Sequence, residues 1–331
     1  MSTPTPVPAP QTTDDFTAHI RPRRAIYGST AVLLPFHADG RINWDDFGRH
    51  LALTAASGLE PALNMDTGFG PQLTPAQRRE VLAFARRQLG PAAPLIAGAA
   101  AFGGPGDALA NYQAAVRDIL DHGATPIVFQ SPWLTALGGP ELAAAYHAIT
   151  APAPRAFAFE LGRMFAPFGA IYDLDTYARL LDIPQLKGAK HSSLDRRLEL
   201  QRLALRDRAR PDWLVLTGND LAIDLVQYGS DYLLGLSTYD PEAFALRDRW
   251  WRDGDARFYQ LNDALQWLGM VGFRDPVPAY KHSAAIYLML SGRMADAHVH
   301  ASCPRRPDWE IDLLRPIQAL VESAKRQPAV V

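Results

Sequence analysis

Eight short apolar runs, each followed by a segment with helical spacing, occupy most of this 331-residue chain. The runs lie at residues 26–36, 61–65, 94–101, 125–129, 155–160, 185–190, 213–217 and 232–236. Such alternation predicts parallel strands joined by crossover helices. Eight strand–helix units favour a closed (β/α)8 TIM barrel over a doubly wound open sheet, which usually has fewer strands. The chain also lacks the glycine-rich phosphate-binding motifs that are typical of such open sheets.

Residues that are typical of helix starts support the division into strand–helix units. Thr74-Pro75-Ala76-Gln77 has the threonine, the early proline and the glutamine of a capping box. Other barrel helices are predicted over residues 45–57, 140–150, 174–181, 194–208 and 221–228, with one more near 241. After Arg252 the strands stop, and three helices are predicted over 255–270, 276–291 and 309–324.

We therefore expect three parts along the chain. They are a disordered Pro/Thr-rich tail over 1–22, the barrel over 23–252 and a C-terminal three-helix extension over 253–331.

Composition excludes several classes of function. A formal net charge of −2 leaves no basic surface for nucleic acid. No apolar stretch reaches the roughly 20 residues that span a bilayer, and the first 15 residues do not resemble a signal peptide. Cys303 is the single cysteine, which excludes an internal disulfide and a cysteine-based metal cluster. We expect a cytoplasmic protein with no cofactor and no metal.

Lys190 is the strongest candidate for chemistry. The chain has 33 basic residues but only four lysines, so arginine serves wherever a positive charge alone is needed. Lys190 stands at the predicted end of the sixth strand, and active sites of barrels form at the carboxyl ends of strands. Burial there lowers the pKa of an amine, and a neutral amine can form a Schiff base with a carbonyl compound.

Other polar residues follow the predicted strands. They are Asp66, Thr67, Trp133, Glu160, Arg163, His191, Asn219, Asp220, Ser237 and Tyr239. Asp66 with Thr67 and Gly68 either binds a substrate carboxylate or hydroxyl, or forms a tight turn. Glu160 is either an acid or base, or the polar end of a strand. Strand alternation predicts that His191 points away from the side of Lys190.

Four segments resemble the dihydrodipicolinate synthase and N-acetylneuraminate lyase family of class I aldolases. Leu34-Pro35-Phe36 resembles its opening T-P-F, and Asp66-Thr67-Gly68-Phe69 resembles its G-T-T-G-E segment. Leu186 to Ser193 resembles its I-x-G-x-K-x-S-S strand, and Gly218-Asn219-Asp220 resembles its G-x-D segment. The similarity extends from about Tyr27 to Val321, and the lysine strand is its most specific part.

The resemblance implies a function. The family forms a Schiff base between the lysine of this strand, here Lys190, and pyruvate or another 2-oxo acid. It implies that Thr67, with the amide of Gly68, holds the carboxylate of the 2-oxo acid. It also implies a barrel with C-terminal helices that assembles as a homo-oligomer, commonly a tetramer.

The departures from the family concern proton transfer. Phe159 stands where the family has its proton-relay tyrosine, and phenylalanine has no hydroxyl. Asp66 replaces the threonine that relays protons to that tyrosine. Trp133 replaces one tyrosine of a pair, and Arg163 is one position away from the arginine that binds the distal carboxylate. True dihydrodipicolinate synthase activity is therefore not expected.

Our leading hypothesis is a carbon–carbon or carbon–oxygen lyase, an aldolase that forms a Schiff base on Lys190 with a 2-oxo acid. Asp66 or Glu160 would be its acid/base. Predicted substrate contacts are Thr67, Gly68, Trp133, Phe159, Arg163, Asn219 and Ser237. The alternative is a non-catalytic 2-oxo-acid or small-molecule binding protein on the same fold, and a hydratase that uses Asp66 and Glu160 is a third possibility.

Overall fold

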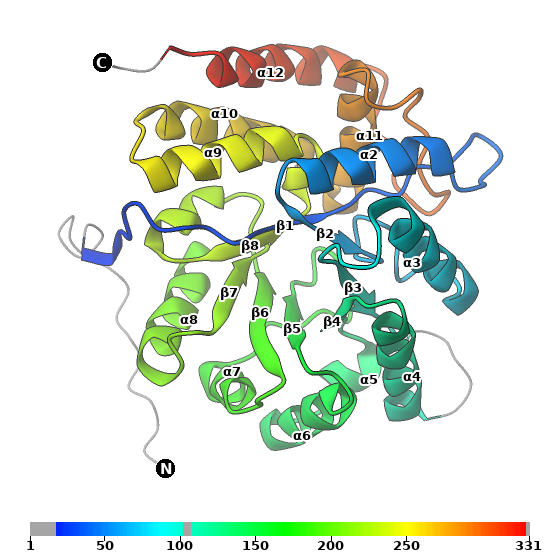
Figure 1. Cartoon of the computed structure of the whole chain (residues 1–331), viewed down its shortest axis with the longest axis vertical. Coiled ribbons are helices and arrows are strands. Elements are labelled where there is room, and N and C mark those ends of the chain that lie inside the picture. Colours follow the sequence, from blue (N-terminus) through cyan, green and yellow to red (C-terminus); the bar gives the residue numbers. More distant parts are fainter. Residues whose placement is uncertain (1–17, 102–106, 329–331) are drawn as a thin grey trace. The chain divides into compact units, whose positions relative to one another are not determined.

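The computed structural model describes residues 18–101 and 107–328 (Figure 1). Most of the predicted tail, residues 1–17, and the glycine-rich segment after the third apolar run, 103–106, lie outside this described part. The Cα positions divide the chain into two compact units. Among the described residues, the first contains 18–21, 94–101, 107–219 and 224–232, and the second contains 22–93, 220–223 and 233–328. The domain boundaries predicted from the sequence stay predictions.

Eight parallel strands follow one another in chain order around a closed barrel, which confirms the predicted (β/α)8 fold. The strands are β1 (Gly28–Ala31), β2 (Glu60–Leu63), β3 (Ile96–Ala99), β4 (Thr125–Val128), β5 (Ala156–Leu161), β6 (Leu186–Ser192), β7 (Leu214–Thr217) and β8 (Asp231–Leu234). Each lies within one or two residues of a predicted apolar run, except that β1 uses only four residues of its run.

The helices match the predicted alternation. They are α2 (Trp44–Ala56), α3 (Pro75–Leu89), α4 (Ala108–Asp121), α5 (Pro132–Thr135), α6 (Gly139–Thr150), α7 (Leu174–Leu181), α8 (Arg196–Ala209), α9 (Pro241–Asp253), α10 (Arg257–Gly272), α11 (Tyr280–Leu290) and α12 (Glu310–Lys325). Thr74 and Gln77 form the predicted capping box at the start of α3.

The helix predicted near 221–228 is present, but it is not an α-helix. This segment is the 3₁₀ helix η1 (Ile223–Tyr228), and two further 3₁₀ turns are η2 (Leu236–Thr238) and η3 (Val277–Ala279). Gly229, with φ at +107°, follows the last residue of η1, and β8 begins two residues later at Asp231. 3₁₀ helices are frequent as connectors, although a run of six residues is longer than most.

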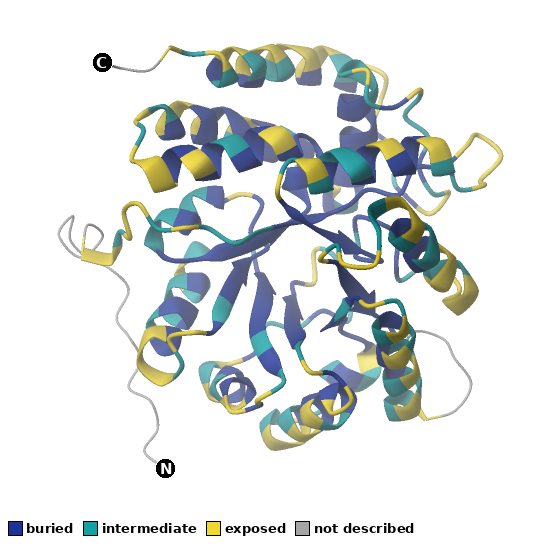
Figure 2. Cartoon of the chain, viewed as in Figure 1, coloured by how far each residue is buried: buried dark blue, intermediate teal, exposed yellow. Residues whose placement is uncertain are grey.

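β5 and β6 are paired strands of the first unit. All six residues of β5 are buried, and Figure 2 shows β5 in the colour of buried residues along its length. The parallel register sets Phe159 beside Lys190 and Glu160 beside His191. Successive side chains on a strand point to opposite faces, so this register gathers two different sets of side chains. One set contains Lys190, and the other faces the helices.

Candidate active site

Lys190 lies on β6 with only 7% of its surface exposed. Its Nζ atom stands 4.5 Å from the centre of the Phe159 ring on the neighbouring strand β5. An aromatic face attracts a cationic ammonium but offers it no proton acceptor. The predicted nucleophile is therefore buried against an apolar side chain at the position where the family has a tyrosine.

Gly218, which follows β7, leaves space for the lysine side chain. A Cβ atom at this position would lie 2.7 Å from Cε of Lys190 and 2.0 Å from Oγ of Ser192. The Gly218 amide donates a hydrogen bond of 2.8 Å to the carbonyl of His191, so its backbone cannot move away. Any larger residue at 218 would displace the end of the lysine side chain.

Ser192 lies two residues beyond Lys190 on β6, so its side chain is on the same face of the strand. Its hydroxyl is buried and finds no hydrogen-bond partner among the residues that the structure describes. A buried hydroxyl without a partner costs free energy. Ser192 is thus a polar group near the lysine that a ligand could satisfy, and the site prediction from sequence did not include it.

Glu160 lies on the opposite face, toward α8. Its two carboxylate oxygens accept hydrogen bonds from the Arg202 guanidinium at 2.6 and 2.8 Å, from the His191 ring and from the Tyr172 amide. Burial alone would raise the pKa of Glu160, but attraction to Arg202 and His191 outweighs burial and lowers the pKa to about 2. His191, whose pKa burial lowers, points away from the face of Lys190 as strand alternation predicted.

The contacts of Glu160 account for its position without a substrate, and its role as an acid or base stays a prediction. Both oxygens are occupied by fixed donors, the side chain is fully buried, and the adjacent Phe159 takes the face of Lys190. The other interpretation, a polar strand end, agrees with the contacts. Glu160 anchors α8 to β5 through Arg202.

Asn219 is also occupied by the protein. Its Nδ2 donates to Oε2 of Glu199 at 2.6 Å, and its Oδ1 accepts from the Leu194 amide at 2.6 Å. Leu194 has φ at +57°, a left-handed conformation that is unfavourable for leucine. Asn219 therefore holds the strained turn between β6 and α8, and its predicted role in binding substrate stays a prediction.

Glu199 on α8 was not predicted as a special residue. It accepts hydrogen bonds from Thr217, Asn219 and Ser230, with the Thr217 distance at 2.8 Å. Burial raises the pKa of Glu199 to about 7, although these hydrogen bonds oppose the shift. Its sequence context, Arg-Arg-Leu-Glu-Leu-Gln-Arg, is typical of a solvated helix face, so the sequence carried no signal of burial.

Two more predicted contacts lie in the first unit. Trp133, on α5, is half-buried, and its ring centre is 6.1 Å from that of Tyr112 on α4. Arg163 is exposed after the end of β5. Neither position tests its predicted contact with a substrate, and both stay predictions.

In the second unit, Asp66 and Thr67 follow β2 and meet the start of α11. The Thr67 hydroxyl is 2.8 Å from the Tyr280 hydroxyl, which donates to Oδ2 of Asp66 at 2.9 Å. Lys281 Nζ lies 3.0 and 3.1 Å from the two Asp66 oxygens. Burial, and next the charge of Asp66, raises the pKa of Tyr280 well above its usual range.

Sequence spacing did not reveal Tyr280 and Lys281, since they are more than 200 residues from Asp66. The one available signal was the rarity of lysine, which applied to Lys281 as much as to Lys190. We call Asp66, Thr67, Tyr280 and Lys281 the α11 cluster.

Gly68 and Ser237 complete the predicted set. A Cβ atom at Gly68 would lie 3.0 Å from the Val32 carbonyl, so the close approach of backbone favours glycine there. Ser237, in η2, is buried, and its hydroxyl donates to the Leu234 carbonyl at 3.0 Å. That bond occupies the Ser237 proton, and the predicted substrate contact stays a prediction.

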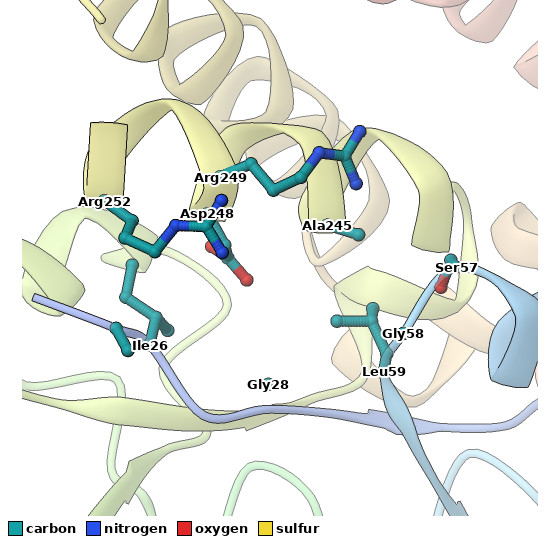
Figure 3. Close-up of a pocket in the computed structure, with 10 residues that line it drawn as sticks. Ile26, Gly28, Ser57, Gly58, Leu59, Ala245, Asp248, Arg249 and Arg252 are labelled. Atoms are coloured by element: carbon teal, nitrogen blue, oxygen red, sulfur yellow. The ribbon is translucent and has the colours of Figure 1, made fainter. Parts of the chain in front are cut away.

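A pocket of about 260 Å³ in the second unit lies away from these strand ends (Figure 3). It is lined by Gly28, the first residue of β1, by Leu59, directly before β2, and by Arg249 and Arg252 of α9. The amino-terminal ends of barrel strands serve stability, and active sites form at the other ends. This pocket is therefore not the candidate active site.

Within residues 18–101 and 107–328, no group of three or more His, Cys, Asp or Glu side chains could hold a metal ion. In the same described ranges, no helix has the length and apolar character needed to cross a membrane.

Comparisons with known proteins agree with the motifs. No family model matches the chain. A 4-hydroxy-tetrahydrodipicolinate synthase of Kosmotoga olearia is 25% identical over 215 residues, which cover 63% of this chain and 69% of that protein.

Solved structures show the same fold. The dihydrodipicolinate synthase of Thermotoga maritima has a TM-score of 0.75 at 18% identity and covers 89% of this chain and 99% of its own. The chloride-inhibited dihydrodipicolinate synthase of Acinetobacter baumannii, in complex with pyruvate, has a TM-score of 0.72 at 18% identity and covers 91% and 99%. In its motifs and its fold, this chain is similar to the dihydrodipicolinate synthases at low sequence identity, as expected of a divergent member.

Proposed function

We propose that the protein is a lyase of the aldolase type that forms a Schiff base between Lys190 and a 2-oxo acid. The observation that carries the proposal is the burial of Lys190 beside Phe159, with space for its side chain kept open by Gly218. The relationship to dihydrodipicolinate synthases, one of which was solved with pyruvate, supports pyruvate or a pyruvate-derived keto acid as the ligand.

The proposed roles follow from the strand ends and the family motifs. Lys190 is the nucleophile. The Ser192 hydroxyl forms a hydrogen bond with the bound ligand. Thr67 and the Gly68 amide hold the carboxylate, and Asp66 is the acid/base group. Phe159, Trp133, Arg163 and Ser237 are proposed substrate contacts. We do not propose dihydrodipicolinate synthase activity itself, because Phe159 cannot transfer a proton.

The test is reductive trapping. The protein is incubated with pyruvate and a panel of 2-oxo acids, treated with borohydride and analysed by intact mass and peptide mapping. We expect a covalent adduct on Lys190 that is absent in Lys190→Ala. Lys187→Ala is the matched control, because Lys187 lies on the same strand with its Nζ bonded to the Pro184 carbonyl. An adduct that persists in Lys190→Ala would remove the assignment.

A second candidate is a non-catalytic 2-oxo-acid binding protein, which the apolar side chain of Phe159 next to the lysine favours. It predicts saturable binding without turnover, and it predicts that Phe159→Tyr would be needed for turnover. Catalytic turnover of a 2-oxo acid by the wild-type protein would exclude it.

The proposal also covers the cellular location and the oligomeric state of the protein. A cytoplasmic homo-oligomer agrees with the single cysteine and with the family resemblance. Neither feature is needed for the chemistry at Lys190.

A further inference from the structure

The residues on both sides of Gly218 are bound by one carboxylate oxygen. Glu199 of α8 is fully buried, and its Oε2 atom accepts hydrogen bonds from the Thr217 hydroxyl at 2.8 Å and from Nδ2 of Asn219 at 2.6 Å. The backbone amide of Asn219 also donates to the Thr217 hydroxyl oxygen at 3.2 Å. All of these residues belong to the first unit, as Lys190 does. Glu199 therefore fixes the chain where β7 ends.

Gly218 is the part of this segment that packs against the proposed nucleophile. A Cβ atom at Gly218 would lie within 2.7 Å of Cε of Lys190 and 2.0 Å of Oγ of Ser192, so the glycine backbone is close to both side chains. A small displacement of Gly218 would change the space that is left for the lysine. The hold on the residues before and after Gly218 thus also determines the position of the end of Lys190.

A second connection runs from Glu199 to the end of β6. Asn219, which Glu199 binds through Nδ2, accepts a hydrogen bond of 2.6 Å from the Leu194 amide through its Oδ1 atom. Leu194 has φ at +57°, a conformation that leucine adopts only when its surroundings hold it. Because Leu194 comes two residues after Ser192, Glu199 also fixes the turn in which β6 ends.

The strength of this hold depends on the charge of Glu199. An ionised carboxylate accepts charge-assisted hydrogen bonds, which are stronger than those to a neutral oxygen. The third donor is Ser230, directly before β8, whose hydroxyl bonds Oε1. When Oε1 takes up a proton, the Ser230 hydroxyl can rotate to accept it. Oε2 then keeps Thr217 and Asn219 through weaker, neutral hydrogen bonds.

The groups around Glu199 keep a constant charge at the pH where Glu199 ionises. Burial raises the pKa of Glu199 to about 7, against the smaller effect of Arg202, whose guanidinium is bonded to Glu160 on β5. Burial raises the pKa of Tyr177 on α7 above its usual range and lowers the pKa of His191 on β6, so both are neutral near pH 7. Of these groups, only Glu199 changes its charge near neutral pH.

We infer that Glu199 is a positioning residue for Lys190, which holds Gly218 and the end of β6 in place and holds them most firmly when its carboxylate is ionised. The inference rests on the proposed function, since it takes Lys190 as the nucleophile. Glu199 acts through Thr217 and Asn219 and is not a catalytic residue. The reactivity of Lys190 thereby gains a dependence on pH that does not come from the lysine itself.

The experiment compares the wild type with Glu199→Gln. Glutamine reproduces the protonated form, because it offers one acceptor oxygen to Thr217 and Asn219 and an NH₂ group to Ser230. The rate of adduct formation with pyruvate is measured by borohydride trapping from pH 6 to pH 9. The ionisation of Lys190 affects both proteins, so it cancels in the ratio of the two rates.

We expect equal rates at pH 6 and a wild-type rate about fivefold higher at pH 9, since hydrogen bonds to charged groups are stronger by roughly this factor. The matched control is Glu80→Gln, at an exposed position of α3, for which the ratio should not change with pH. A merely structural glutamate would give a constant ratio, because glutamine retains its contacts.

Ser230→Ala gives an independent test that leaves Glu199 able to ionise. The Ser230 hydrogen bond lowers the pKa of Glu199, so its loss should move the ionisation to higher pH while Thr217 and Asn219 stay bound. The wild type and Ser230→Ala should then differ in rate only between the two ionisations.

The outcomes separate the inference from the proposed function. A ratio of wild type to folded Glu199→Gln that is constant, or that falls as the pH rises, would overturn the inference while the adduct on Lys190 stays in place. If Glu199→Gln does not fold, a constant ratio of wild type to Ser230→Ala would overturn it. Absence of any adduct in the wild type would overturn the proposed function and the inference with it.

Discussion

Glu160 and Glu199 are both fully buried around α8, yet their surroundings shift their pKa values in opposite directions. Arg202 and His191 overcome the effect of burial on Glu160, whose pKa falls to about 2. Glu199 has only hydroxyl and amide donors in direct contact, and burial raises its pKa to about 7. Glu160 therefore stabilises the fold above its ordinary pKa, and this contribution disappears as the pH falls toward 2.

Glu199 has the opposite dependence on pH. Its folded pKa lies above the ordinary value of 4.5, so the folded state binds the extra proton between these two pH values. The stability from Glu199 is complete below pH 4.5 and is lost as the pH rises through 7, by at most about 3 kcal/mol. We predict that Glu199→Gln, which cannot ionise, raises the melting temperature relative to the wild type more at pH 8 than at pH 5.5.

Melting temperatures of both proteins at the two pH values check this prediction. Glu80→Gln, at an exposed position of α3, is the control for the loss of a surface charge. A difference between wild type and Glu199→Gln that is equal at both pH values would show that Glu199 stays ionised in the fold.

At the scale of elements, the end of β7 controls the space around Lys190. The pairing of β6 with β7 sets the His191 carbonyl against the Gly218 amide, and the glycine therefore stays close to the lysine. We predict that Gly218→Ala slows adduct formation on Lys190 by roughly 100-fold, because a shift near 1 Å can cost that much. The rate of adduct formation is measured by stopping the reaction with borohydride at increasing times.

The control for this prediction is Gly138→Ala at the start of α6. A Cβ atom there meets only the Glu141 carboxylate, at 3.4 Å. An unchanged rate in Gly218→Ala would mean that Lys190 reaches its ligand along a path that avoids Gly218.

Local sequence patterns predicted these elements well, because each strand and helix carries its own signal. Thr74 and Gln77 marked the start of α3, and the apolar run at 185–190 marked β6. Alternation along β6 even gave the direction of His191. The roles of charged side chains were harder to predict from the sequence. A glutamate such as Glu160 or Glu199 is the same residue whether it lies on a helix face, at a strand end or in the interior. The positions of Arg202 and His191 decide the state of Glu160.

At the scale of the whole molecule, the chain brings together residues that no local pattern connects. Tyr280 and Lys281 meet Asp66 from the far end of the chain, so no spacing rule could join them. The helices after Arg252 looked like an appendage in the sequence. In the second unit, α11 instead contributes half of the α11 cluster, and α10 and α12 present an apolar surface.

That surface leads to the last prediction. Tyr259, Trp267 and Met270 of α10 are 57%, 51% and 55% exposed, and their spacing puts them along one face of the helix. Trp309, Leu313 and Leu320 repeat the pattern along α12. Exposed apolar patches of this kind mark association surfaces. We predict that the proposed homo-oligomer assembles through α10 and α12, and that Trp267→Glu converts it to monomers.

Light scattering after size exclusion gives the mass of each species across a range of protein concentrations. Met164→Glu, at an exposed apolar residue after β5, should leave the oligomer intact. An oligomer that survives Trp267→Glu would place the interface elsewhere, and a monomeric wild type would remove the proposed assembly. Because Trp267 is exposed and makes no part of the α11 cluster, the adduct on Lys190 should form in Trp267→Glu monomers as in the wild type. That result would separate the assembly of this protein from its chemistry.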